Sequence, residues 1–249
     1  MENLYNQIKP KFPLIAAVIE GRQKGTILKN DPTNPTHAFV INKFGFCQEF
    51  YTQFDASFFT KITNLVQARE YVKLRMYAPT GEMEQFLNNV DFADKSERIQ
   101  FTYVGNPGET LELAPCFEIR KLSRNDLLKA NLKSVFIDRY WNDDDDFFEN
   151  AMPFGAFVNS QTLVGMCYTA GIGMNTVEFD IFVDKEKQRQ KLGEALAQKF
   201  IRCCQSHRLS PSWDCYTNNM ASLRLAEKVG FKETVTYVFY NIAGRAKGE

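Results

Sequence analysis

The chain has 249 residues, of which 44% are hydrophobic and 24% are charged. That length permits one large domain or two modest ones, and the composition is that of an ordinary globular protein rather than a disordered chain. Thirty Lys and Arg residues balance thirty Asp and Glu residues. Nucleic-acid binders normally carry a basic excess, because neutralising phosphates supplies most of their affinity, so we expect no nucleic-acid partner.

The cysteines and the N-terminal segment set the expected compartment. Six cysteines form no CxxC pair, and only His37 and His207 accompany them, so the sequence offers no set of zinc ligands. No apolar run is long enough to span a bilayer, and the first residues lack the layout of a secretory signal. We therefore expect a cytoplasmic protein that binds no metal and does not associate with a membrane.

The first part of the chain has a mixed α/β pattern. Residues 14–20 form a short, apolar, β-branched run that predicts a strand, and residues 25–28 and 38–41 predict two more. From Phe54 to about residue 75 apolar residues recur at helical spacing, with Asp55 placed to cap a helix. A second helix is predicted at 81–89 and a strand at 99–104.

The loop sequence at residues 105–108 suggests a domain boundary. We expect a smaller α/β domain over 1–108, on the acceptor side, and a second domain over 109–249. Within the second domain the predicted elements are, in chain order, a strand at 116–122, a helix from Ser123 to about 136, a helix that begins at the acidic run 143–146, strands at 156–158, 163–168 and 176–183, a helix at 191–205, a strand at 213–216, a helix at 221–229 and a strand from Phe231.

The junction between the strand at 176–183 and the next helix is the most informative segment. A short loop there leads directly into an amphipathic helix. The first-turn N–H groups of a helix have no partners within the helix, and they lie at the positive end of its dipole. This arrangement predicts a phosphate-binding site, although a plain capped helix would have the same pattern.

This junction resembles the acetyl-CoA pyrophosphate loop of the GNAT N-acetyltransferase superfamily, whose pattern is Arg/Gln-x-x-Gly-x-Gly/Ala. Gln188 matches the first position and Gly193 the last, and Lys191 departs from the middle glycine. A register that begins at Gln190 matches fully but lies two residues late. Three later blocks, PSWDC at 211–215, NMAS at 219–222 and LAEKVGF at 225–231, resemble a GNAT subgroup related to the zwittermicin-resistance acetyltransferases.

The resemblance implies a fold and a set of cofactor contacts. The fold is a mixed central sheet with splayed strands and flanking helices, and the co-substrate is acetyl-CoA. The pantetheine arm would follow the strand at Phe182 and Val183. The pyrophosphate would be held by backbone N–H groups of Gln188, Arg189, Gln190, Lys191, Leu192 and Gly193. Asn219 would contact the cofactor or cap the last helix, and both roles are open.

The resemblance also suggests the residues that catalyse the transfer. Glu178 matches a position that often carries the base that deprotonates the amine, and Asp180 is the second candidate. Both could equally be exposed strand carboxylates. The tyrosine that commonly protonates the thiolate is replaced by Ala226, and Tyr216, Tyr168 or water could substitute.

The leading hypothesis is therefore an N-acetyltransferase that moves acetyl from acetyl-CoA to a primary amine of a small molecule in a ternary complex. The alternative is a non-catalytic acyl-CoA-binding sensor or interaction protein, and a third hypothesis is an aminoacyl transferase that uses charged tRNA. A homodimer is compatible with the sequence. Whether the first half is a degenerate copy of the same fold is left open.

Overall fold

The structure is a computed structural model that describes residues 1–105, 111–130 and 138–245. The residues group into two compact units, Met1–Ile99 with Val235–Glu249, and Gln100–Thr234. Two long strands, β5 (Ala93–Tyr103) and β11 (Phe231–Ala243), have residues in both units. The expected division after residue 108 concerns independent domains and stays a prediction.

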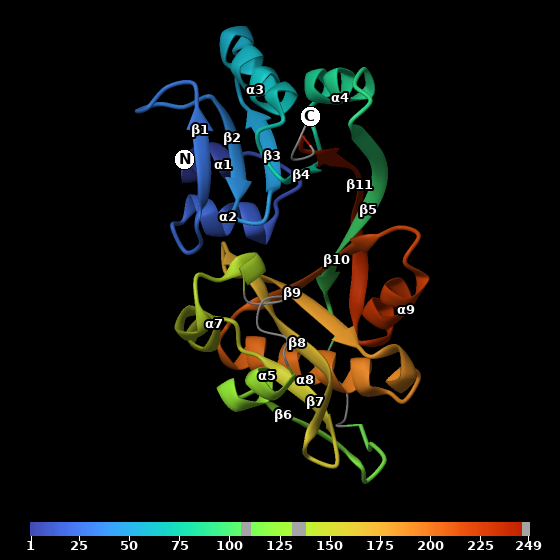
Figure 1. Ribbon diagram of the computed structural model, residues 1–249. Coiled ribbons are helices and arrows are strands. Elements are labelled where there is room, and N and C mark those ends of the chain that lie inside the picture. The colour runs from blue at the N-terminus through green and yellow to red at the C-terminus, as the bar shows by residue number, and fades with distance from the viewer. Residues whose placement is uncertain (106–110, 131–137, 246–249) are drawn as a thin grey trace. The chain divides into compact units, whose positions relative to one another are not determined.

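The first unit is built around a mixed sheet (Figure 1). The strand order is β1-β2-β3-β4-β11-β5; β1, β2 and β3 are antiparallel neighbours, β4 runs parallel to β3, and β11 runs antiparallel to β4. The other elements of this unit are α1 (Glu2–Tyr5), α2 (Pro13–Ile19), β1 (Gly25–Lys29), β2 (His37–Asn42), β3 (Phe46–Tyr51), α3 (Ala56–Ala68), β4 (Lys73–Tyr77) and α4 (Gly81–Asn88).

Alternation along the strands of the first unit separates two apolar layers. On one face Phe58 and Ile62 of α3 and Met83 of α4 pack with strand residues such as Met76 in a single buried cluster. On the other face Phe12, just before α2, stacks on Tyr77 with ring centroids 4.1 Å apart. The sheet is therefore covered on both faces.

Two predictions for the first unit are wrong. Residues 14–20, expected to be a strand, lie in helix α2, which begins at Pro13, a residue type favoured in the first turn of a helix. The helix expected from Phe54 to about residue 75 ends after Ala68, because Arg69 adopts a left-handed conformation with φ of 58°. The chain that follows forms β4, and neither β3 nor β4 was predicted.

The second unit contains the remaining strands and the helices α5, α7, α8 and α9. In sheet order its strands are β5-β10-β9-β8-β7-β6, with β9 and β10 parallel and β6 to β9 antiparallel. Helix α8 packs against β7, β8 and β9 (Figure 1). The elements are β6 (Phe117–Lys121), α5 (Arg124–Ala130), α7 (Asp144–Asn150), β7 (Phe154–Val158), β8 (Thr162–Gly173), β9 (Thr176–Val183), α8 (Leu192–Ser206), β10 (Ser210–Tyr216) and α9 (Met220–Lys228).

The sequence predicts this unit well. Strand β9 has the expected bounds, and α8, β10 and α9 begin and end within about three residues of them. The acidic run begins a helix as predicted: Asp143 is the N-cap of α7 and accepts a bond of 2.9 Å from the Asp146 N–H. The helix expected from Ser123 is observed as α5, and its later part lies outside the described residues.

The mixed sheet with helices on its faces confirms the predicted α/β class. In the part of the chain that the structure describes, no helix combines the length and the apolar composition needed to cross a bilayer.

Candidate active site

The central strands of the second unit separate, as the predicted fold requires. β9 and β10 are paired only at their first residues, Thr176–Glu178 with Ser210–Ser212. The following five residues of β9, Phe179–Val183, continue beyond this parallel pairing. The two strands therefore part just after Glu178.

A cleft of about 600 Å³ lies where the strands part. That volume is typical of a site for a cofactor or small molecule. Three segments line it: the end of β9, the loop into α8 with the first turn of that helix, and the chain from β10 through α9. The lining residues include Phe182, Val183, Gln188, Arg189, Lys191, Leu192, Gly193 and Asn219 of the predicted site. Gln190, Glu178 and Asp180 are described residues that do not line this cleft.

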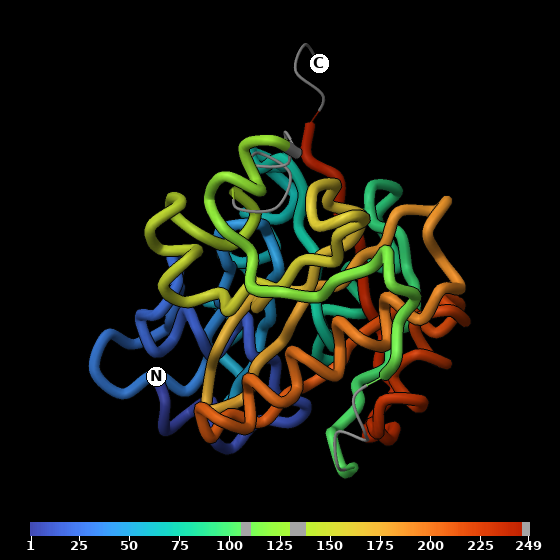
Figure 2. Tube along the Cα trace, turned by 90° about the horizontal axis from the view of Figure 1, so that it is seen from below, coloured from blue at the N-terminus to red at the C-terminus, as the bar shows by residue number. Residues whose placement is uncertain are grey.

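The loop between β9 and α8 has a backbone conformation suited to anion binding. Figure 2 shows only the path of this part of the chain, in orange. Arg189 and Lys191 have φ values of 61° and 62°, which lie in the left-handed region. Alternation of left-handed and ordinary residues makes successive N–H groups converge on one side of the chain. Lys191 is also the N-cap of α8, and its side chain has no acceptor for the first-turn N–H groups. No N-cap side chain therefore bonds to these amides, and residues of this first turn line the cleft.

The charge of the cleft is strongly positive. Five cationic side chains and one carboxylate line it. The cations are those of Lys187, Arg189, Lys191, Arg224 and Lys228, and the carboxylate is that of Glu194. The carboxylate is buried and pairs with Lys228 at 2.6 Å. A diphosphate would gain attraction from the surplus positive charge and from the helix dipole.

Gly193 allows two helices to approach closely at the mouth of the cleft. A Cβ atom at this position would lie 3.3 Å from Leu225 Cδ2 of α9. Contacts that short are tighter than ordinary van der Waals packing. The glycine that the sequence associates with ligand approach therefore also has a packing role.

Asn219 is the N-cap of α9, as one of its two predicted roles requires. Its Oδ1 accepts a hydrogen bond of 3.2 Å from the Ser222 N–H. The residue also lines the cleft, so a contact with the cofactor stays a prediction.

The two carboxylates proposed for catalysis, Glu178 and Asp180, are two residues apart on β9, so both side chains lie on the same face of the sheet. Glu178 is 8% exposed and is the last residue paired with β10. Asp180 is half-buried, accepts a hydrogen bond of 3.0 Å from the Tyr168 hydroxyl and lies 3.8 Å from Arg139 Nη1. Burial, followed by the charge of Asp180, raises the pKa of Tyr168 well above its usual value. Tyr168 is therefore held in its neutral form.

The sequence predictions missed the cations of α9 and the partner of Asp180. Arg224 and Lys228 are spaced four residues apart, so they lie on one face of α9, and that spacing was readable in the sequence. Arg139 comes from a different segment, and no local pattern connects it with Asp180. Among the described residues, no group of three or more His, Cys, Asp and Glu side chains converges in a way that could hold a metal ion.

Comparisons with known proteins agree with this geometry. A family model described as GNAT acetyltransferase matches residues 2–240. The uncharacterised N-acetyltransferase YdfB of Bacillus subtilis (strain 168) is 23% identical over 248 residues, which is 95% of each chain.

Two solved structures share the fold. A GCN5-related N-acetyltransferase-like protein from Streptococcus suis has a TM-score of 0.74 at 18% identity, covering 98% of this chain and 100% of that one. A tandem GNAT protein from the clavulanic acid biosynthesis pathway has a TM-score of 0.63 at 10% identity, covering 98% and 94%. Because the family model spans nearly the whole chain, this protein belongs to the GNAT acetyltransferase family.

Proposed function

We propose that the second unit binds acetyl-CoA in the cleft between β9 and β10 and transfers the acetyl group to a primary amine of a small molecule. The observation that carries this proposal is the cleft itself. Two parted strands lead to the start of α8, which has no side-chain cap, and five cations line the same cleft. An adenine nucleotide thioester with a diphosphate fits this combination of an extended groove and a positive end.

Different segments of the chain would bind different parts of the cofactor. Phe182 and Val183, at the end of β9 beyond its pairing with β10, line the cleft and would lie along the pantetheine arm. The amides from Gln188 to Gly193 would hold the pyrophosphate. Bound acetyl-CoA supplies an activated thioester, so the protein has to provide orientation and a route for the amine proton.

Glu178 is the residue we propose as the base. An amine attacks only in its neutral form, and a carboxylate accepts its proton directly or through water. Glu178 is buried and is the last residue of β9 that pairs with β10, so it lies where the two strands begin to part. Asp180 is the second candidate, because its carboxylate is engaged by Tyr168 and Arg139.

Direct transfer is favoured over an acyl-enzyme. Cys215 of β10 is 5% exposed, and Cys167 of β8 is fully buried. Burial raises the pKa of Cys167 well above that of a free thiol, which disfavours the reactive thiolate. A ternary complex needs no such nucleophile.

A non-catalytic acyl-CoA sensor is the second candidate function. Ala226, at the position where the resemblance places a tyrosine, is fully buried and carries no ionisable group. This observation favours a protein that keeps the cofactor cleft without the usual proton donor. The small-molecule acceptor, the zwittermicin-resistance type of subgroup, the possible homodimer and the cytoplasmic location all stay predictions.

The test combines binding with turnover. We expect acetyl-CoA to raise the melting temperature, because a ligand of the native state stabilises it. Release of the coenzyme A thiol is then measured across a panel of primary amines, with Glu178→Gln as the matched variant. Turnover that Glu178→Gln abolishes supports the acetyltransferase. Binding without turnover by any amine supports the sensor, and the absence of any acetyl-CoA binding overturns both.

A further inference from the structure

The two units of the chain repeat one order of elements. In the first, helix α2 precedes three strands, β1, β2 and β3, and the chain continues through α3, β4, α4 and β5. In the second, helix α7 precedes β7, β8 and β9, and the chain continues through α8, β10, α9 and β11. The first three strands are antiparallel in both, and the strand after the first long helix is parallel to the third.

The parallel pair of the first unit also parts early. β3 and β4 are matched only at Phe46 with Arg75 and at Cys47 with Met76. The rest of β3, as far as Tyr51, continues beyond this pairing. This is the relationship between β9 and β10, so the first unit contains the counterpart of the cofactor cleft.

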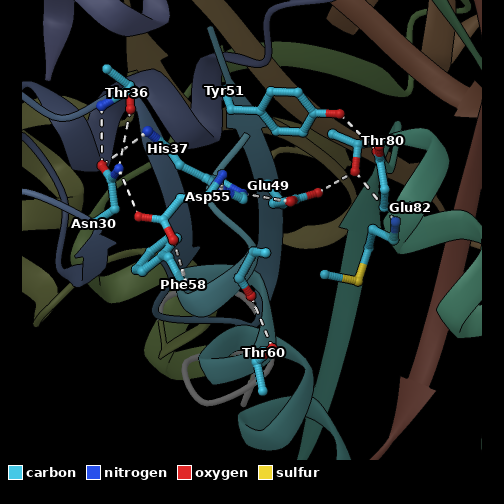
Figure 3. Close-up of polar contacts among 12 residues, drawn as sticks. Asn30, Thr36, His37, Glu49, Tyr51, Asp55, Phe58, Thr60, Thr80 and Glu82 are labelled. Atoms are coloured by element: carbon cyan, nitrogen blue, oxygen red, sulfur yellow. Dashed lines mark hydrogen bonds and ion pairs between the residues drawn. The ribbon is translucent and has the colours of Figure 1, made fainter. Parts of the chain in front are cut away.

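Side chains of the first unit bridge this counterpart position (Figure 3). Glu49, on the free part of β3, accepts a hydrogen bond from the hydroxyl of Thr80, which is the N-cap of α4. Tyr51, at the end of β3, donates a hydrogen bond of 2.7 Å to Glu82 in the first turn of α4. Two hydrogen bonds thus join β3 to the chain that follows β4. The corresponding region of the second unit, between β9 and the chain that follows β10, is the cleft.

A buried histidine holds the bridging carboxylate in place. His37 of β2 and Glu49 are both fully buried and lie 2.7 Å apart, Nε2 to Oε1. The Asp55 N–H donates to His37 Nδ1 at 3.2 Å, so this nitrogen is an acceptor and Nε2 carries the proton that is donated to Glu49. The network therefore connects β2, β3, α4 and the residue that precedes α3.

A side chain caps the first turn of α3, whereas the N-cap residue of α8 makes no such bond. The loop from β3 to α3 is short, residues 52–55, whereas residues 184–191 connect β9 to α8. Asp55 caps α3: its Oδ1 accepts from the Phe58 N–H at 3.0 Å and from the Ser57 hydroxyl at 2.9 Å. A carboxylate therefore lies over the amides that would have to hold a diphosphate.

The charges at the two positions are opposite. Glu49, Asp55 and Glu82 contribute three carboxylates at the counterpart position in the first unit. The cleft of the second unit has five cations and one carboxylate. A diphosphate at the first position would be repelled by these carboxylates and would also have to displace the hydrogen bonds that they accept.

We propose that the first unit is a second copy of the acyltransferase fold whose cofactor cleft is closed by its own side chains. The place that a nucleotide would fill is taken by the side chains of Glu49, Tyr51, Asp55, Thr80 and Glu82. The consequence, which rests on the proposed function, is that one chain binds one molecule of coenzyme A, in the second unit.

Calorimetric titration of the full chain with coenzyme A measures the number of sites. We expect one molecule per chain, and at least ten-fold weaker binding in Lys191→Glu; Lys232→Glu, an exposed charge reversal outside the cleft, serves as the control. Hydrogen exchange with and without coenzyme A should show protection at 184–194 and none at 49–58. Two molecules per chain, or protection at 49–58, would overturn the closed cleft.

A second measurement needs no ligand and separates this proposal from the proposed function. Thr80→Val removes the hydroxyl that donates to Glu49, and Glu49→Gln leaves one acceptor oxygen for the two donors Thr80 and His37, so each variant loses one hydrogen bond with little change of shape. We expect each to lower the melting temperature by several degrees and to speed exchange at 52–58 and 80–83 at least ten-fold, with no change at 188–193. Unchanged exchange in both variants would overturn the bridge. If wild type bound no coenzyme A but these variants behaved as expected, only the proposed function would fail.

Discussion

The Tyr168 hydroxyl donates a hydrogen bond of 3.0 Å to Asp180 Oδ2, and the register of β8 and β9 places these two residues opposite each other. Arg139 Nη1 lies 3.8 Å from the same oxygen. Asp180 is therefore contacted by two side chains from other segments of the chain. We predict that Glu178, rather than Asp180, acts as the base.

Replacing Glu178 by Gln keeps the size of the side chain and removes its basicity. We expect kcat/KM to fall by about 10²–10⁴, the usual contribution of a general base, and the Kd for acetyl-CoA to stay within about two-fold. Steady-state kinetics and calorimetry measure the two quantities. Asp180→Asn is the comparison and should lose less activity. A larger loss in Asp180→Asn than in Glu178→Gln would transfer the role of base to Asp180.

The cations of α9 should contribute to cofactor affinity. Replacing Arg224 by Ala removes one charge from the cleft, and we expect the Kd for coenzyme A to rise about five- to thirty-fold, equivalent to one charge-assisted bond of about 1–2 kcal/mol. Because salt screens exposed charges, the difference from wild type should shrink as ionic strength increases. Calorimetry at two salt concentrations provides the measurement, with Lys232→Ala as control. An effect of equal size in Lys232→Ala would show that overall charge, and not the cleft, is responsible.

Gly193 should tolerate alanine and resist larger side chains. Alanine gains about 1 kcal/mol of helix propensity over glycine, which offsets the tight 3.3 Å approach to Leu225, so Gly193→Ala should be nearly neutral in stability. Gly193→Val adds a branch and should lower the melting temperature by several degrees and weaken coenzyme A binding. Truncating the partner, in Gly193→Val with Leu225→Ala, should restore part of the loss. Thermal unfolding of Gly193→Ala, Gly193→Val, Leu225→Ala and the double variant checks this, and purely additive losses would contradict a direct clash.

The sequence predicts the second unit better than the first for a physical reason. β9 alternates apolar residues with polar ones, and α8 has one apolar stripe, so each pattern has one periodicity and one solution. Residues 14–19 are apolar without a clear period because α2 is buried over nearly all of its length, and such a run does not distinguish a helix from a strand. The helix predicted from Phe54 was too long for a similar reason, since apolar residues continue beyond the left-handed Arg69 into β4.

The candidate site shows the same limit. Most residues that the motif indicated after β9 line the cleft, because they are neighbours in the chain. The partnership of Asp180 with Arg139 and the network of His37, Glu49 and Thr80 join segments far apart in the chain. No spacing rule connects such residues, because only the packed sheet brings them together.

Asp55 provides a pH-dependent test of the cap on α3. The Phe58 N–H, then the hydroxyl of Ser57 and the amide of Asn30, lower the pKa of Asp55 from 3.8 to about 2. A carboxyl whose pKa is lower in the folded state stabilises the fold above its unfolded pKa, and this contribution is lost as the pH falls through the folded value. Wild type should therefore exceed Asp55→Asn in melting temperature at pH 5, and the difference should shrink between about pH 4 and pH 2.

The comparison of two substitutions at Asp55 separates charge from hydrogen bonding. Asparagine can still accept the Phe58 N–H, whereas Asp55→Ala removes the cap altogether and should be less stable at every pH in this range. The gap between the Asn and Ala variants should not depend on pH, because neither side chain titrates. Melting curves of the three proteins at half-unit steps provide the data. If the difference between wild type and Asp55→Asn were constant from pH 5 to pH 2, the carboxylate would not be held as a charged cap, and the electrostatic part of the argument for a closed first cleft would fail with it.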